Sequence, residues 1–200
     1  LVAHAKGSSW QEAADEMIRN LQPVGEEHRL GFLYVTDSFA ASLEDIYAFL
    51  RQTTGVPNWV GTVGFGICAP GKEYFGEAAM AAMVAPIPEK AFRVFGGISD
   101  DIAPAIANIA DWLSDTPPLV VTHADPRNEN VPRIIEDLSR ETDGFLIGGL
   151  TSSNGAHPQL AGEVAEGEVV LVKLVNNRVN NRVNNRVEGG KEAINWLRCT

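Results

Sequence analysis

The sequence predicts an α/β (or α+β) fold in which internally duplicated strand–helix–strand units form mixed sheets covered by helices. Short apolar runs of strand type alternate with amphipathic stretches along the chain. A strand–helix–strand pattern occurs twice, and its two copies are offset by 87 to 88 residues. Of the 200 residues, 44% are hydrophobic, which is ample for a buried core.

Apolar residues at helical spacing predict four helices. The clearest one begins with a capping-box pattern, in which Ser9 is followed three residues later by Glu12. In the third, Pro104 falls in the first turn, where proline is tolerated. The expected helices cover residues 9–21, 42–55, 102–113 and 130–144, the last of them ended by Gly144.

Short apolar runs bounded by turn residues predict strands between these helices. The alanine- and methionine-rich part of residues 75–87 is also compatible with a helix. Strands that alternate with helices indicate sheets with helices packed on them. The expected strands cover residues 30–35, 59–67, 75–87, 92–95, 119–122, 145–147 and 169–175.

The two halves of the chain match in order and spacing. Leu33–Asp37 aligns with Val121–Asp125 at an offset of 88, and Trp59–Gly61 aligns with Leu146–Gly148 at an offset of 87. A helix of similar length lies between the matched strands in both halves. Each half then enters a loop rich in glycine. We therefore predict a duplication, with copies at about 30–87 and 118–172.

The net charge of −10 is unevenly distributed. Residues 1–172 contain 10 lysines and arginines against 24 acidic residues, whereas residues 173–200 contain 6 against 2. An acidic body repels phosphate backbones, so we expect no nucleic-acid partner. The longest apolar stretch, Ala78–Ile87, is half the length of a membrane span of about 20 residues, so we expect no membrane partner.

The ends and the cysteines suggest a cytoplasmic fragment. The N-terminus lacks a methionine and the basic-then-apolar order of a signal peptide. Cys68 and Cys199 cannot form a disulfide framework, which fits a reducing compartment. The histidines at 4, 28 and 157 lack metal-ligand spacing, so no metal site is expected.

Residues 66–72 fit the phosphate-binding pattern G-x-x-x-x-G-K. That loop needs Ser or Thr at the next position to ligate Mg²⁺, but the chain has Glu73 there, whose carboxylate would repel a phosphate. Pro70-Gly71 is also a common turn dipeptide. We interpret the segment as a strand–turn–strand connection and expect no cofactor.

Two glycine-rich strand ends form a candidate site for a small polar ligand. Short hydroxyl and amide side chains follow Gly148-Gly149 directly, beside backbone that a ligand can approach closely. The same composition is also typical of an ordinary polar loop. The candidate ligand-binding residues are Gly61, Thr62, Gly64, Cys68, Gly148, Gly149, Thr151, Ser152, Ser153 and Asn154.

Two other functions stay open. Cys68 with His123 and Asp125 could serve as nucleophile, base and orienting acid in a hydrolase or transferase. A cysteine after a glycine-rich strand is more often a small buried residue, so an enzyme is the less favoured interpretation. The acidic body could also act as a protein-interaction scaffold.

Four stretches of the chain resemble the N-terminal half of the FIST (F-box and intracellular signal transduction) sensory domain. They are AHAKGSSWQEAADEMIRNL, LGFLYVTDSFA, NWVGTVGFGICAPGKEY and DGFLIGGLTSSNG, and the likeness covers about residues 3–172. The resemblance implies a cytoplasmic sensor that binds a small ligand, with amino acids or related metabolites as the usual suggestion. It also implies a downstream signalling protein and a C-terminal half of the FIST domain as partners, and it supplies no catalytic residues.

The predicted sensory domain covers residues 1–172. The tail, residues 173–200, begins with a strand end and then contains Val-Asn-Asn-Arg three times. This repeat matches no solenoid period and cannot bury a face, so it is interpreted as a low-complexity linker or a sequence artefact.

Overall fold

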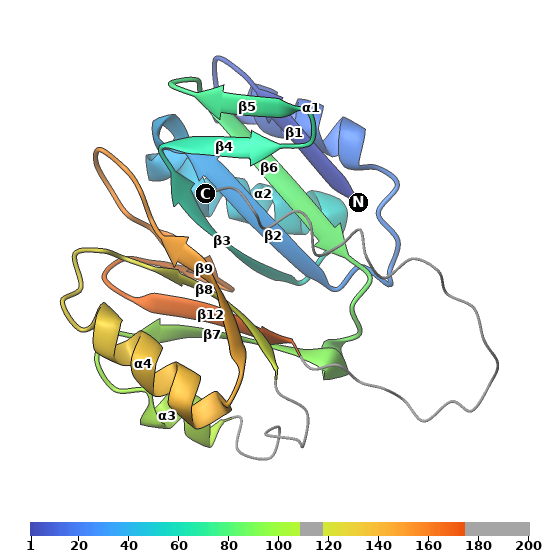
Figure 1. Cartoon of the computed structure of the whole chain (residues 1–200). Helices are drawn as coiled ribbons and strands as arrows, with labels where there is room; N and C mark the ends of the chain where they lie inside the picture. The colour runs from blue at the N-terminus through green and yellow to red at the C-terminus, as the bar shows by residue number, and fades with distance from the viewer. Residues whose placement is uncertain (109–117, 175–200) are drawn as a thin grey trace, which may run out of the picture.

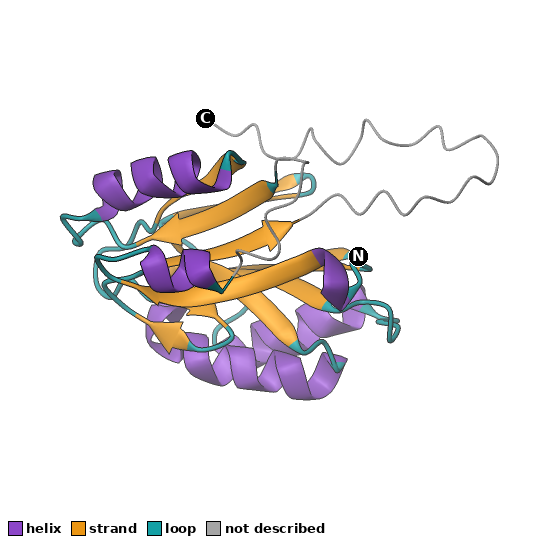
Figure 2. Cartoon of the chain, turned by 90° about the horizontal axis from the view of Figure 1, so that it is seen from below, coloured by secondary structure: helices purple, strands orange, loops and turns teal. Residues whose placement is uncertain are grey.

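The computed structural model describes residues 1–108 and 118–174, in which two mixed sheets stack face to face between outer helices (Figures 1 and 2). The mixed α/β class predicted from the sequence is confirmed. Three apolar clusters hold the four layers together. One lies between the first sheet and its helices, one between the two sheets, and one between the second sheet and its helices.

The first sheet has six strands in the order β1-β6-β2-β3-β10-β11. Strands β2 and β3 are parallel, and every other pair in this sheet is antiparallel. The parallel pair flanks a helix, as a strand–helix–strand crossover requires. The strands are β1 (Val2–Lys6), β2 (Leu30–Thr36), β3 (Asn58–Gly64), β6 (Ala79–Ala85), β10 (Gln159–Ala161) and β11 (Val164–Ala165).

The second sheet has four strands in the order β7-β12-β8-β9. Strands β8 and β9 are parallel, and β12 is antiparallel to both of its neighbours. The strands are β7 (Phe92–Ile98), β8 (Leu119–Ala124), β9 (Phe145–Leu150) and β12 (Val169–Leu174).

A separate hairpin follows β3. Its strands, β4 (Gly66–Ala69) and β5 (Lys72–Phe75), pair with each other and with no other strand of the described residues. Gly71 in the turn has a positive φ of 72°, which glycine adopts without strain. The interpretation of G-x-x-x-x-G-K as a strand–turn–strand connection is confirmed. The alternative of a helix near residues 75–87 is wrong, because residues 79–85 form β6.

The helices are α1 (Trp10–Leu21), α2 (Leu43–Thr54), α3 (Ala103–Ala107) and α4 (Val131–Thr142), and short 3₁₀ helices cover Asp37–Ser42 and Glu89–Ala91. Ser9 caps α1 by accepting the N–H of Glu12, but the Glu12 carboxylate accepts from Ser8 and so does not complete the expected box with Ser9. α4 ends at Thr142, and Asp143, one residue before the expected Gly144, takes the left-handed conformation that ends it. Residues 109–113 of the expected third helix lie outside the described residues.

The two sheets share one topology. The order β1-β6-β2-β3 corresponds to β7-β12-β8-β9, with the same strand directions, and in both halves two helices and a short hairpin occupy the same places along the chain. The correspondence begins at β1 and β7, earlier than the copies expected at about 30 and 118. The duplication itself stays a prediction. Among the helices of the described residues, none has the length and apolar character to cross a membrane.

Candidate functional site

The two predicted ligand loops meet between the sheets. The hydroxyl oxygens of Thr62, on β3, and Thr151, directly after β9, lie 2.6 Å apart in a hydrogen bond between buried side chains. Gln159 of β10 lies opposite Thr62 and donates from Nε2 to the Thr151 hydroxyl at 2.8 Å. These three residues form a buried polar cluster at the carboxyl ends of β3 and β9.

A tyrosine–histidine pair extends this cluster from the first sheet to the second. The Tyr34 hydroxyl and His123 Nε2 are 3.1 Å apart, and their rings pack edge to face. Tyr34 neighbours Thr62 across β2 and β3, and His123 neighbours Gly149 across β8 and β9. Burial raises the pKa of Tyr34 to about 12 and lowers that of His123 to about 4, so both are neutral at pH 7.

Several buried polar atoms around this cluster have no hydrogen-bond partner among the described residues. They are His123 Nδ1, Gln159 Oε1 and His157 Nδ1; a fourth unpartnered atom, Thr122 Oγ1, lies on the opposite face of the second sheet. Folded proteins pair almost all of their buried polar atoms with protein groups, water or ligands. A group of such atoms beside two glycine-rich strand ends is therefore a place where a small polar molecule would find partners.

Asp37 holds the loop that closes this region. Its carboxylate accepts hydrogen bonds from the Ser153 hydroxyl and from the backbone and side-chain amides of Asn154, at 3.1 and 3.0 Å. The bond from Ser153 is the main reason that the pKa of Asp37 is lowered. On the other side, the Ser152 hydroxyl accepts the N–H of Phe65 at 3.0 Å. Thr151, Ser152, Ser153 and Asn154 are thus all engaged with the chain itself.

Three of the four glycines of the predicted site have packing roles. A Cβ on Gly61 would lie 1.8 Å from the carbonyl oxygen of Leu33, and one on Gly148 would lie 1.8 Å from that of Thr122. Gly64 has a similar constraint, since its Cβ would be 2.6 Å from the oxygen of Gly66. Glycine is needed at these positions because neighbouring backbone comes too close for any side chain.

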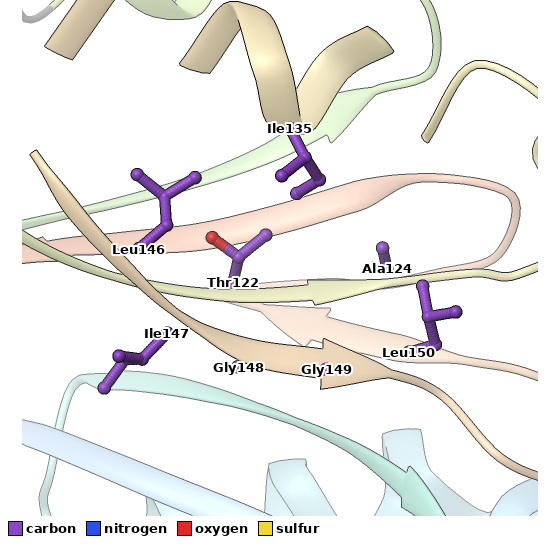
Figure 3. A pocket seen from close by; sticks show the side chains of 8 residues that line it. All are labelled: Thr122, Ala124, Ile135, Leu146, Ile147, Gly148, Gly149 and Leu150. Atoms are coloured by element: carbon purple, nitrogen blue, oxygen red, sulfur yellow. The ribbon is translucent and has the colours of Figure 1, made fainter. Parts of the chain in front are cut away.

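Gly148 and Gly149 also line a cavity of about 290 Å³ on the opposite face of the second sheet, beneath α4 (Figure 3). Its walls are apolar apart from Thr122, whose hydroxyl rises from β8 between Leu146 and Ile135 in this view. This cavity and the polar cluster lie on opposite faces of one sheet, because Thr122 and His123 are successive residues of β8.

The residues of the alternative enzyme site have separate partners. His123 Nε2 lies against Tyr34, while the Asp125 carboxylate accepts from Arg127 and from the N–H of Gly167. Burial raises the pKa of Asp125, but the hydrogen bonds from Arg127 outweigh it and bring the value to about 2. None of the hydrogen bonds among the described residues joins His123 to Asp125. Cys68 is exposed and lies opposite Glu73 in the β4–β5 hairpin.

The chain matches the FIST N domain over residues 29–195. It belongs to the FIST N-domain family. This is a family of sensory domains of signal transduction, so the resemblance noted in the sequence is confirmed. A comparison with curated proteins finds no match.

This FIST N domain has site residues that the sequence did not single out. Tyr34, Gln159 and Asp37 all contact the predicted loops, yet each lies on a strand or turn whose relation to those loops depends on how the sheets stack. Asp37 did carry a signal, because it aligned with Asp125 after the matching strand. A second hollow of about 570 Å³ was also missed; it surrounds the ion pairs of Arg127 with Asp125 and Glu166.

Proposed function

We propose that this FIST N domain is a cytoplasmic sensory module that binds a small polar ligand, an amino acid or a related metabolite, beneath the loop at residues 151–154. The observation that supports this is the buried polar cluster of Thr62, Thr151 and Gln159, with unpartnered polar atoms of His123, His157 and Gln159 beside it. A ligand that supplied the missing partners would remove the cost of leaving those atoms unpaired, about 1–3 kcal/mol each.

The chemistry of the cluster favours a ligand with several hydrogen-bonding groups. Hydroxyl, amide and neutral imidazole groups can each bind a carboxylate, an amide or a hydroxyl. Asp37 stands at the rim as a carboxylate, since its pKa is lowered, and it would attract an ammonium group. Neutral hydrogen-bonding groups next to the Asp37 carboxylate suit an α-amino acid or a close relative.

Sensing would follow from the loop. A ligand under residues 151–154 would compete with the bonds that tie Ser153 and Asn154 to Asp37, and so shift the balance between a closed and an open loop. A downstream signalling protein or the C-terminal half of the FIST domain would read that change.

The test is a thermal-shift screen of the chain against the amino acids and small polar metabolites. A ligand at 100 times its Kd stabilises by about 2.7 kcal/mol, which raises Tm by about 5–10 °C for a chain of this size. Thr62→Val and Thr151→Val should abolish the shift. Thr122→Val is the matched control, since that hydroxyl is equally buried but faces the other side of β8, and it should keep the shift. The proposal fails if no compound raises Tm, or if all three variants respond alike.

A further inference from the structure

In the part of the chain that the structure describes, the second sheet ends in an unprotected edge strand. Within the described residues β9 pairs only with β8, and its side chains Phe145 and Leu150 are 70% and 59% exposed. Natural edge strands are usually protected by charged residues, proline or a covering element. The six residues of β9, FLIGGL, contain neither charge nor proline, so this edge has the properties of a strand that another strand covers.

The backbone of β9 offers hydrogen bonds at this edge. Phe145 and Thr151 donate their N–H groups toward β8, to the carbonyls of Pro118 and Ala124 at 2.8 and 2.9 Å. Because successive residues of a strand point their backbone groups to opposite sides, Leu146, Gly148 and Leu150 point theirs to the open edge.

The corresponding edge of the first sheet shows how such a strand is covered. There β3 is paired antiparallel with β10, and Leu160 lies directly opposite Gly61. Leu160 is fully buried on the helix-covered face, within the cluster that packs against α1 and α2. Gly61 and Gly148 are equivalent, since a Cβ on either would lie 1.8 Å from a carbonyl of the neighbouring parallel strand.

Beside Gly148, the place that Leu160 fills in the first sheet is empty. The apolar cavity of about 290 Å³ lies there, between Ile135 of α4 and the side chains of Leu146 and Leu150 (Figure 3). A leucine side chain opposite Gly148, on an added antiparallel strand, would enter this cavity in the way that Leu160 enters the core beneath α1 and α2.

We propose that the added strand is β9 of a second copy of this chain, paired antiparallel about a two-fold axis at Ile147. In this register the partner's Leu146 lies opposite Gly148, and the partner's Phe145 lies opposite Gly149. The strand is self-complementary, because its two bulky residues precede Ile147 and its two glycines follow it. Leu146 and Gly148 both direct backbone groups outward, so each such pair exchanges two hydrogen bonds.

The order of bulky residues and glycines selects this register. Moving the partner by two residues would set Gly148 opposite the partner's Gly148 and leave the cavity unfilled. Large side chains opposite strand glycines restore the contact area that glycine lacks, and aromatic residues do so best. A strand of unrelated sequence would have no reason to match both positions at once.

Sedimentation equilibrium of the chain, from about 1 to about 300 µM, tests the proposal. A reversible monomer–dimer equilibrium is expected. Each copy carries a net charge of −10, so raising the salt concentration should strengthen association by screening the repulsion. A chain that stays monomeric over this range at 0.5 M salt (roughly a 4 Å Debye length) overturns the proposal.

Variants of β9 locate the interface. Phe145→Lys and Gly149→Leu should each raise the dimer Kd at least about tenfold. A Cβ at 149 meets no atom within 4 Å in the single chain, and the urea midpoint of Gly149→Leu at low protein concentration checks that this variant folds. Phe75→Lys is the matched control, since Phe75 is 72% exposed on the β4–β5 hairpin, and it should leave Kd unchanged. A dimer that Phe145→Lys and Gly149→Leu do not weaken contradicts the proposal.

A disulfide trap checks the register. Ile147→Cys, made in a chain with Cys68 and Cys199 replaced by serine, should form a disulfide-linked dimer under mild oxidation. The two Ile147 residues would form a non-hydrogen-bonded antiparallel pair with Cα atoms about 4.5 Å apart, close enough for a disulfide. A Phe75→Cys chain in the same background should stay monomeric. A dimer in sedimentation without a cross-link at 147 would rule out this register.

Discussion

The outer edges of the two parallel strand pairs, β3 and β9, make the most informative comparison in this molecule. Both strands carry a glycine pressed against a neighbouring carbonyl, and both lie beside a helix-covered face. Strand β3 is covered by β10, whose Leu160 is buried opposite Gly61. Within residues 1–108 and 118–174, β9 is open on its outer side and has a cavity beside Gly148. One topology therefore gives a completed edge in the first sheet and an incomplete one in the second.

The largest loss of unfolding free energy is expected at Gly61, where the covered strand β3 lies closest to its neighbour's backbone. Gly61→Ala places a methyl group against the Leu33 carbonyl in a strand paired on both sides, and should cost about 5 kcal/mol or more in unfolding free energy. Gly148→Ala adds the strain of a positive φ of 137°, but β9 is paired on one side among the described residues and can shift outward, so we expect the smaller loss there. Urea unfolding measures both, and Gly149→Ala should be nearly neutral. Equal losses for Gly61→Ala and Gly148→Ala would contradict the difference between the edges.

Leucine truncations compare the covered and the open position directly. Leu160→Ala removes a fully buried side chain and should lower the free energy of unfolding by about 4 kcal/mol. Leu146→Ala removes a half-buried one and should cost about 1 kcal/mol at protein concentrations low enough to keep the chain monomeric. If Leu146→Ala costs as much as Leu160→Ala in the monomer, β9 is not open.

The Tyr34–His123 contact between the sheets predicts an acid-sensitive fold. The pKa of His123 is about 4 in the folded chain and 6.5 when unfolded, so the unfolded state takes up the proton first as pH falls. The contribution of His123 to the free energy of unfolding should be constant above pH 6.5 and fall by about 3 kcal/mol between pH 6.5 and 4. His123→Phe should flatten this slope in urea titrations across that range. A slope that is unchanged in His123→Phe would exclude the buried neutral imidazole as its cause.

Substitutions of the aspartates after the matching strands β2 and β8 should have modest effects. Asp125 is fully buried with Arg127 and Gly167, so Asp125→Asn should cost about 2 kcal/mol. Asp37→Asn weakens only the ties to Ser153 and Asn154 and should cost about 1 kcal/mol. Its sharper signature is faster hydrogen exchange at residues 151–155, which the exposed Asp15→Asn control should lack. Unchanged exchange in Asp37→Asn would show that the carboxylate does not hold the loop.

Elements with a complete local signal could be predicted from the sequence. The cap at Ser9, the helical spacing through Leu21 and the apolar run that begins at Leu30 produced α1 and β2 with nearly correct bounds. The short strands β1, β10 and β11 were missed. Three residues such as Gln159–Ala161 carry no periodicity, and they form a strand only because β3 lies beside them.

The residues of the candidate site also fall into those that the sequence could indicate and those that only the tertiary structure shows. Thr62 and Thr151 could be chosen because each follows a glycine-rich strand, and the structure joins them at 2.6 Å. Tyr34 and Gln159 could not be chosen, because their place beside these threonines results from sheet stacking and from the pairing of β10 with β3.

The sequence by itself determined the local elements and the α/β class, together with two glycine-rich strand ends offset by 87 residues, because helix periodicity, caps and turns act over a few neighbouring residues. Only the tertiary structure decided that the hairpin β10–β11 joins β3 rather than β9, which has no second partner strand in the part of the chain that the structure describes. That choice depends on pairings between residues about 100 positions apart, such as Leu160 with Gly61. Such pairings are set by the packing of whole layers against one another, and no local pattern records them.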